Sequence, residues 1–294
     1  MTSQATQQNA NRVQQTLHEA AKTQQIYRPV TGVHPRVELP DDAHEAWLEG
    51  NHDVEYVVIN FSDAKTVIER DGDLQTVLEP YQVPVILGTE HDEVVNNRTI
   101  QAVIDLLRIV QPAIYVPDVV YNYRWMCEQR QAYAIEAYLN HLRNLQELII
   151  EHDLEIRLLP TNKGWKREHF EDYQELFTDY DYDEFAFYAV QYTGGDAGNA
   201  SRKLRDHIRN LISAVDPTNV FVIGRLAETD LVDFDPRVGG ATGLRQWTAA
   251  CTIGSQLSQD LWAAFQHRRE QKLAVNDDQQ QQRLTNIDIQ QEEL

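Results

Sequence analysis

Apolar residues recur along the middle of this chain in short runs that alternate with longer amphipathic stretches. In the stretches they fall at helical spacing, as Leu204, Ile208 and Leu211 do. The short runs have the length of strands buried on both faces. The pattern predicts strands over 54–61, 83–87, 113–116, 155–159, 184–191 and 219–223, and helices over 43–48, 63–70, 74–81, 97–110, 122–152, 167–177, 199–215 and 245–273.

Strands that alternate regularly with helices indicate the α/β class. Six strands are each followed by a helix, and a very short seventh is predicted near 241–244. This count favours a TIM-like (β/α) barrel, closed or incomplete, over a doubly wound parallel sheet. The doubly wound sheet stays open as the alternative.

The chain divides into three parts by composition. We expect residues 1–50 to form an N-terminal extension, with an extended lead-in over 27–40 that holds three prolines, and with an extra N-terminal helix. Residues 51–273 form the barrel domain. Residues 274–294 are a Gln-rich tail that we expect to be disordered, because it has no periodic apolar face.

The charge is the compositional outlier. The chain carries 46 acidic and 26 basic residues, a net charge of −20, and only six of the basic residues are lysines. An acidic, lysine-poor surface is typical of the cytoplasm of a halophilic archaeon, and fits a protein of its virus equally well. At molar salt the Debye length falls to about 3 Å, so this charge does not exclude a polyanionic partner. At low salt it would oppose nucleic acid.

Several classes of protein are not expected from this sequence. It has no apolar run long enough to span a membrane and no secretory signal at its start. Its two cysteines form no CxxC pattern that could hold zinc. We therefore expect a cytoplasmic protein without a membrane anchor, metal or cofactor. The oligomeric state is left open.

Carboxylates follow two of the predicted strands. Asp118 comes directly after the third strand, where barrel active sites are built, although it could instead cap the next helix. Glu90 and Asp92 follow the second strand, beside His91, and form a cluster capable of acid–base chemistry. The alternative for this cluster is an exposed acidic loop.

Other candidates follow the later strands. Gly194 and Gly195, with nearby Gln191, close the fifth strand before a helix, where backbone amides can hold a phosphate or a flat base. A plain tight turn explains these glycines equally well. Arg225 ends the sixth strand and could bind a phosphate or pair with Asp118.

Three residues combine an aromatic face or positive charge with the start of a helix. Trp165 and Lys166 follow the fourth strand, and Arg245 precedes Trp247. Such residues suit contact with nucleic acid, although the start of a surface helix explains them equally well.

The segments that carry these candidates resemble a known family. Val116 to Val120 resembles the substrate-binding aspartate strand of the tRNA-guanine transglycosylase superfamily, and more closely that of its DNA-acting 7-deazaguanine branch. Tyr188 to Gly195, Phe221 to Leu226 and Gly240 to Trp247 occupy the places of that family's later glycine-ended strands. The resemblance spans residues 54–250.

The resemblance implies a (β/α) barrel that exchanges a purine base on a nucleoside within RNA or DNA, through an aspartate nucleophile. It makes Asp118 the base-recognising carboxylate, and Gly194 and Gly195 the amides that hold the base. This chain departs from the family at the catalytic positions. Gly243 to Arg245 stands where the nucleophile should be, and Gly88-Thr89 where the acid–base aspartate should be. The zinc site of the tRNA enzymes is absent.

Three interpretations follow. The first is a transglycosylase-like barrel that binds a guanine or deazaguanine base, or nucleic acid, and whose catalysis is lost or relocated. Its pocket would hold Asp118, Gln191, the two glycines and Arg225. The second is an active pentosyltransferase-type enzyme that uses Glu90 or Asp92. The third is a structural or interaction protein of a halophilic virus or its host.

Overall fold

Eight strands form one curled parallel sheet in the computed structural model, which describes residues 28–192 and 197–274. The strand order is β5-β4-β3-β2-β1-β8-β7-β6, so chain neighbours are sheet neighbours throughout, and β1 pairs with β8. The strands are β1 (Gly32–Val37), β2 (Tyr56–Asn60), β3 (Val83–Leu87), β4 (Ile114–Val116), β5 (Arg157–Leu158), β6 (Glu184–Tyr188), β7 (Asn219–Ile223) and β8 (Gly240–Gly243).

The order of the strands is that of a (β/α) barrel rather than of a doubly wound sheet. The two outer strands are joined by one parallel bridge, between Thr161 and Ala186, with a hydrogen bond of 2.7 Å from the Ala186 N–H to the Pro160 carbonyl. Among the described residues no longer ladder links β5 to β6. The predicted fold class, a TIM-like barrel closed incompletely, is confirmed.

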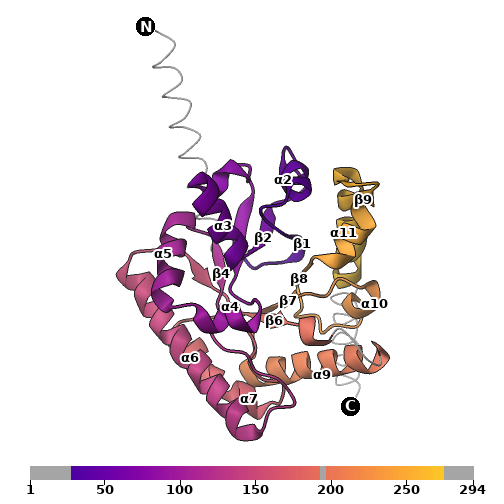
Figure 1. The fold of residues 1–294 in the computed structure, drawn as a ribbon. Helices are drawn as coiled ribbons and strands as arrows, with labels where there is room; N and C mark the ends of the chain where they lie inside the picture. The colour runs from indigo at the N-terminus through magenta and orange to yellow at the C-terminus, as the bar shows by residue number, and fades with distance from the viewer. Residues whose placement is uncertain (1–27, 193–196, 275–294) are drawn as a thin grey trace, which may run out of the picture.

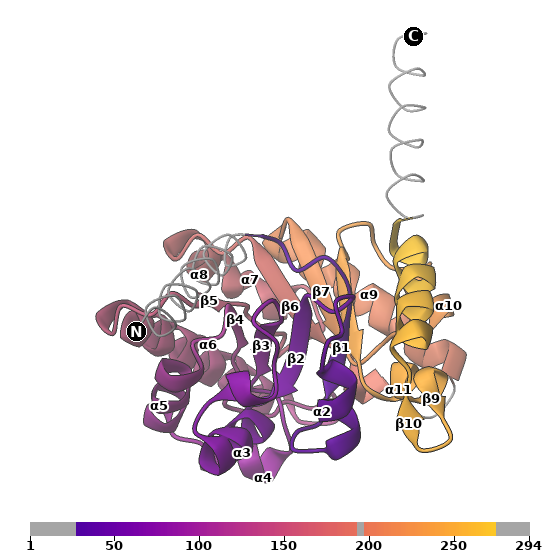
Figure 2. The same cartoon turned by 90° about the horizontal axis from the view of Figure 1, so that it is seen from above.

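Helices surround the strands on their outer side (Figures 1 and 2). They are α2 (Asp42–Leu48), α3 (Phe61–Asp71), η1 (Leu74–Thr76), α4 (Asp92–Asn97), α5 (Ile100–Val110), α6 (Glu128–Glu151), α7 (Glu168–Glu171), α8 (Tyr173–Asp179), η2 (Val190–Tyr192), α9 (Ala197–Val215), α10 (Glu228–Leu231) and α11 (Arg245–Cys251). A hairpin of β9 (Thr252–Ile253) and β10 (Gln256–Leu257) leads to a last helix over 259–274.

One strand is missing from the sequence prediction. The prolines of 27–40 indicate an extended lead-in, but the structure makes Gly32–Val37 the strand β1, between β2 and β8. Pro35 does not prevent this, although it has no N–H to donate to the sheet. The barrel therefore begins inside the segment expected to be an N-terminal extension. Residues 1–27 and the tail over 275–294 lie outside the described residues.

Several predicted boundaries also differ. The helix predicted over 74–81 is the short turn η1, and the one predicted over 167–177 is divided into α7 and α8. The helix predicted to begin at Asn122 begins at Glu128, and the loop before it reaches over the end of the barrel. The helix predicted over 245–273 is interrupted by the hairpin β9–β10. Val190 to Tyr192 leaves the strand β6 as a 3₁₀ turn, so this strand ends at Tyr188.

The strands separate two apolar cores. Alternate residues of each strand point to opposite faces, so Val57 and Ile59 pack against the helices while Tyr56 and Val58 point into the barrel. The interior core is small and continuous, and includes Val58, Val85, Ile114, Ala186 and Phe221. The larger outer core anchors the helices and leaves the strand ends free to present polar groups.

A buried polar cluster supports the weak side of the barrel at the amino ends of the strands. Arg157 of β5 contacts Glu184 of β6 at 2.5 Å, and Glu184 also accepts a hydrogen bond of 2.6 Å from Asn219. Burial raises the pKa of Glu184, and Arg157 acts against that rise. The ion pair thus joins two strands that share a single backbone bridge among the described residues.

None of the described helices is long and apolar enough to cross a membrane.

Candidate site at the mouth of the barrel

A polar hollow of about 560 Å³ lies where the carboxyl ends of the strands meet. We refer to it as the mouth pocket. Residues from the ends of β1 to β6 line it, so six separate segments contribute to one cavity. This is the end at which parallel barrels carry their sites. The lining includes Arg36, Asn60, Thr89, Glu90, Asp92, Asp118, Asn122, Lys163, Tyr188 and Gln191.

A buried ion pair forms one wall of this pocket. The Lys163 Nζ lies 2.5 Å from the Asp118 Oδ1, and the two residues are only 7% and 4% exposed. The same Asp118 oxygen accepts a hydrogen bond of 3.2 Å from the Val120 N–H. The Lys163 ammonium also lies 5.4 Å from the centre of the Tyr138 ring. Asp118 is therefore fixed in place by the end of β5, a partner that the sequence did not indicate.

Gly88 allows the end of β3 to pack against the end of β4. Its N–H donates to the Val116 carbonyl at 2.7 Å. A Cβ at this position would lie 2.8 Å from the backbone nitrogen of Asp118, closer than real Cβ contacts come. A residue with a side chain here would push Asp118 away from the pocket. Gly88 thus gives a close approach between the backbones of the two strand ends.

The structure does not support a helix-capping role for Asp118. Helix α6 begins at Glu128 with Cys127 as its N-cap, ten positions beyond Asp118. Asn122 does not cap this helix either. Its side-chain amide donates to the Lys163 carbonyl at 2.5 Å and to the Gln131 carbonyl at 3.4 Å. Both residues instead hold the loop between β4 and α6 over the barrel.

Glu90 lines the mouth pocket but is fully engaged. It forms a buried ion pair with Arg98, and its other oxygen accepts from the Ser62 N–H at 3.0 Å. Arg98 in turn donates to the Gly88 carbonyl at 2.7 Å and lies over the Phe61 ring. Both carboxylate oxygens of Glu90 are occupied by these donors, so this arrangement favours a structural role for Glu90.

Asp92 is placed differently. It lines the mouth pocket at the first residue of α4, and both of its oxygens lie within hydrogen-bond distance of the Tyr123 hydroxyl, at 2.8 and 3.0 Å. No described lysine or arginine forms an ion pair with it. Burial and the adjacent Asp92 carboxylate raise the pKa of Tyr123 to about 12. The phenol therefore remains a donor at neutral pH, and Asp92 is a carboxylate available for chemistry.

Four buried polar atoms in the mouth pocket have no hydrogen-bond partner among the described residues. They are the Arg36 Nε, the Asn60 Oδ1, the Thr89 Oγ1 and the Asn122 Oδ1. Buried polar atoms of folded proteins nearly always have a partner, so each unpartnered one needs an explanation. The Asn122 amide orientation is fixed, because its NH₂ group binds two carbonyls. The pocket thus presents a mixed set of donors and acceptors.

The remaining predicted residues are not all brought together. Gln191 lines the mouth pocket, whereas Arg225 does not. Arg225 donates to the Tyr192 carbonyl at 2.7 Å and lies 3.6 Å from Asp230, so its partner is Asp230 rather than Asp118. Gly194 and Gly195 lie outside the described residues.

The residues expected to contact nucleic acid lie away from the mouth pocket. The Trp165 ring is only 7% exposed and packs edge-on against His169, so it offers no open face to a base. Lys166 pairs with Glu128 on the surface at 3.2 Å. Arg245 is exposed at the start of α11. None of the three lines the mouth pocket.

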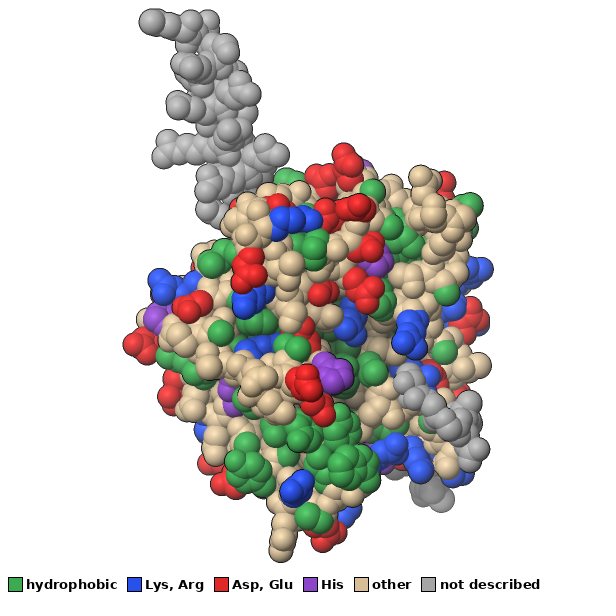
Figure 3. All heavy atoms as spheres, in the orientation of Figure 1, with side chains coloured by type: hydrophobic (Ala, Val, Ile, Leu, Met, Phe, Trp, Pro, Cys, Tyr) green, Lys and Arg blue, Asp and Glu red, His purple; other side chains and the backbone are tan. Residues whose placement is uncertain are grey.

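An aromatic segment beside the pocket was not among the predicted site residues. Tyr121, Tyr123 and Trp125 alternate along the loop between β4 and α6. Consecutive ring centres lie 5.6 and 5.7 Å apart, and the Tyr123 and Trp125 rings are nearly parallel. Figure 3 shows a hydrophobic patch on this face, below acidic and histidine side chains. The alternation of aromatic residues outside any strand was the available signal.

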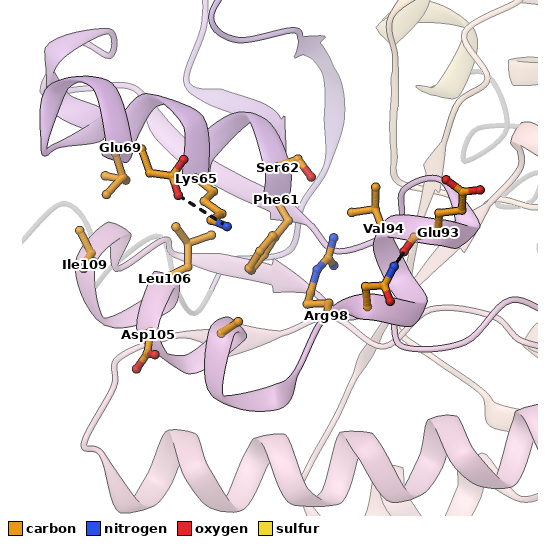
Figure 4. A pocket seen from close by; sticks show the side chains of 13 residues that line it. Phe61, Ser62, Lys65, Glu69, Glu93, Val94, Arg98, Asp105, Leu106 and Ile109 are labelled. Atoms are coloured by element: carbon orange, nitrogen blue, oxygen red, sulfur yellow. Dashed lines mark hydrogen bonds and ion pairs between the residues drawn. The ribbon is translucent and has the colours of Figure 1, made fainter.

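A second hollow, of about 670 Å³, lies outside the barrel between α3 and α5 (Figure 4). Its walls are mainly apolar, with Phe61, Leu106 and Ile109 facing it. The Glu90–Arg98 pair separates it from the mouth pocket, since Glu90 lines one hollow and Arg98 the other. Of its charged residues, Lys65 and Glu69 pair with each other at 3.5 Å.

The described residues contain no group of three or more His, Cys, Asp or Glu side chains placed to hold a metal ion. The chain matches no protein-family model and no curated protein at a significant level. Its function must therefore be argued from the mouth pocket itself.

The buried pair predicts a strong dependence of stability on Lys163. Lys163→Met leaves the Asp118 carboxylate buried without a cation, which should lower the free energy of unfolding by about 3–5 kcal/mol. The double variant Asp118→Asn/Lys163→Met should recover most of that loss, because no charge remains buried. Urea unfolding measures both. Lys166→Met, which breaks an exposed pair, is the control and should change stability by less than about 1 kcal/mol. Equal losses in Lys163→Met and the control would contradict this account.

Asp63 predicts a pH effect beside the mouth. It lies in the first turn of α3 and accepts from the Leu39 N–H at 3.3 Å. Burial raises the pKa of Asp63 to about 6, and the neighbouring Glu90 and Glu38 carboxylates add to this. A carboxyl whose pKa is higher in the folded state stabilises the fold below its unfolded pKa and loses that effect as the pH rises. The stability of the native protein relative to Asp63→Asn should therefore fall between about pH 4 and pH 6, in urea unfolding at constant salt. A constant difference over this range would refute it.

Proposed function

We propose that the mouth pocket binds a flat, polar heterocycle of the guanine or 7-deazaguanine type. The observation that carries this proposal is the set of four buried, unpartnered polar atoms on Arg36, Asn60, Thr89 and Asn122. The guanidinium N–H of Arg36 can donate, the two amide oxygens can accept, and the Thr89 hydroxyl can do both. A guanine edge offers a carbonyl acceptor beside N–H donors, which matches such a mixed set.

The walls of the pocket support a flat ligand. Tyr121, Tyr123 and Tyr188 line the same cavity as the unpartnered atoms. Aromatic rings offer large rigid faces to a planar group, while a few polar atoms fix its orientation. The cavity of about 560 Å³ is in the range of small-molecule sites. The resemblance of 116–120 to a base-recognising strand agrees with this choice.

Asp118 has a different part in this proposal from the one expected by resemblance alone. Asp118 is paired with Lys163, so one wall of the mouth pocket holds a negative and a positive group side by side. Such a pair can face a ligand edge that carries both a donor and an acceptor. Replacing Asp118 would also break the buried pair, so an effect on binding could not be separated from an effect on folding. Thr89 is the better position to test.

The substitution Thr89→Val should weaken binding without harming the fold. It removes the unpartnered hydroxyl and keeps the shape of the side chain. We expect affinity for 7-deazaguanine, measured by calorimetry in molar KCl, to fall about ten-fold, equivalent to about 1.4 kcal/mol. The melting temperature should not fall, because the hydroxyl has no partner in the free protein. Thr66→Val, on the exposed side of α3, is the matched control and should change neither quantity.

Two results would overturn the proposal. The first is the absence of binding by the native protein to guanine and 7-deazaguanine at millimolar concentration. The second is tight binding that is unchanged in Thr89→Val and in a second variant, Asn60→Leu, which removes another of the unpartnered atoms.

Asp92 supports a second candidate function, an active base-exchange enzyme. It is the mouth-pocket carboxylate that no described lysine or arginine pairs with, and the Tyr123 hydroxyl orients it. A carboxylate in this position can attack a sugar carbon or take a proton. Asp92→Asn should then lower the rate at which labelled deazaguanine is incorporated into an oligonucleotide by several powers of ten. Base binding should survive. Absence of incorporation by the native protein would reject the exchange activity and leave the binding proposal intact.

A further inference from the structure

The loop between β4 and α6 leads outward from the mouth pocket through three aromatic rings. We name Tyr121, Tyr123 and Trp125 the aromatic loop. Tyr121 and Tyr123 line the mouth pocket, whereas Trp125 does not and is 78% exposed. The rings therefore run from the cavity into solvent. Aromatic rings that are clustered at a surface often mark a binding site, unlike single exposed ones.

A further cavity, which we name the outer hollow, lies next to these rings. It has a volume of about 580 Å³ and is lined by Tyr123, Arg124, Trp125, Gln191 and Lys203. Tyr123 and Gln191 line both this hollow and the mouth pocket. The two cavities are thus adjacent parts of one surface, and a chain-like ligand can occupy both.

The charge at the outer hollow is positive, in contrast with the protein as a whole. Arg124 and Lys203 line it, and neither forms an ion pair with any carboxylate of the described residues. The Arg124 guanidinium lies 5.1 Å from the centre of the Tyr192 ring, which holds it beside the outer hollow. Two available cations next to exposed aromatic rings match a ligand that has flat rings and negative charges.

We propose that the aromatic loop is a stacking platform for an unpaired stretch of single-stranded polynucleotide. Successive bases stack on Trp125 and Tyr123, phosphates face Arg124 and Lys203, and the next base enters the mouth pocket. This last step rests on the proposed function; the stacking itself does not. Aromatic–base stacking contributes about 1–3 kcal/mol per base and accepts any base, because every base has a flat face.

The geometry favours this ligand over two others. A neutral glycan can also stack on aromatic rings, but it would leave both cations without a counter-charge. In a duplex the bases stack on each other and their faces are covered, so they cannot reach the rings. The overall charge of −20 opposes any polyanion at low salt, but at molar salt its field is screened within about 3 Å.

Trp125 allows a direct test by fluorescence. The other four tryptophans, Trp47, Trp165, Trp247 and Trp262, are buried. Stacking of a base on Trp125 should therefore quench the exposed part of the tryptophan emission. The probe is an oligothymidylate of about twelve nucleotides, titrated in molar KCl. The duplex that it forms with the complementary oligodeoxyadenylate and a neutral glucan oligosaccharide are the comparisons.

Variants then locate the site. Affinity for a fluorescein-labelled oligothymidylate, measured by anisotropy, should fall about ten-fold or more in Trp125→Ala and in Tyr123→Ala, and less in Trp125→Phe, which keeps a ring. Lys203→Gln should reduce the slope of log affinity against log salt by about one. Tyr133→Ala is the matched control, because Tyr133 is also an exposed aromatic residue, at 70%, but lies on α6 outside both hollows. It should bind as the native protein does.

Each outcome decides the proposal. Loss of strand binding in Trp125→Ala and Tyr123→Ala, with Tyr133→Ala unchanged, supports it. Equal binding in all variants, equal binding of duplex, or binding of the glucan in preference to the strand overturns it. Calorimetry with the free base separates the two proposals. If the base binds and the strand does not, the platform is rejected and the mouth pocket stands. If the strand binds through Trp125 and no base does, the mouth pocket is rejected.

Discussion

Side chains hold the barrel together between β5 and β6. Among the described residues a single backbone bridge joins these strands, so side chains must supply what a ladder of hydrogen bonds supplies elsewhere. At the amino end this is the Arg157–Glu184 pair. At the carboxyl end it is Asn162, whose side-chain oxygen accepts from the Tyr188 N–H at 2.7 Å, together with the neighbouring Lys163 and its pair Asp118. The residues that close the barrel at its carboxyl end therefore also form its mouth.

This overlap explains why the mouth is polar and rigid at once. Asp118 and Lys163 neutralise each other in a buried place, and Asn122 ties the following loop to the Lys163 backbone. In contrast, Arg36, Asn60 and Thr89 each hold a buried polar atom that has no partner among the described residues. A protein that only needed stability would fill these positions with apolar side chains, since an unpaired buried polar atom is destabilising by about 1–3 kcal/mol. Departures from optimal packing concentrate at functional sites.

The repeating architecture could be predicted from the sequence because it depends on local periodicity. The ranges of β3 and β7 follow directly from runs of buried residues, and Asp118, Asp92, Glu90 and Gln191 meet at one mouth because strand ends do so in any such barrel. The strand β1 was missed because Pro35 and its neighbours resemble a loop locally. Its place between β2 and β8 is decided by pairing with segments far away in the chain.

The partners of the site residues could not be predicted for the same reason. Lys163 is 45 positions from Asp118, and nothing in either segment shows that they touch. Trp165 lies in a stretch that looks exposed, yet its ring packs against His169 and its carbonyl accepts from Asn210 of α9. Arg36 and Asn60 point into the mouth because of the inward alternation of β1 and β2, which requires the correct strand limits. Sequence motifs therefore indicate which strand ends hold the site residues. Contacts between distant segments decide which of those side chains have no protein partner.

A crystal structure of the protein soaked with 7-deazaguanine would show directly whether the mouth pocket binds a base. We expect a flat ligand in the mouth pocket, with its polar atoms within about 3.2 Å of at least two of the four unpartnered atoms on Arg36, Asn60, Thr89 and Asn122. An empty mouth whose four polar atoms are each satisfied by ordered water, or a ligand bound elsewhere, would contradict it.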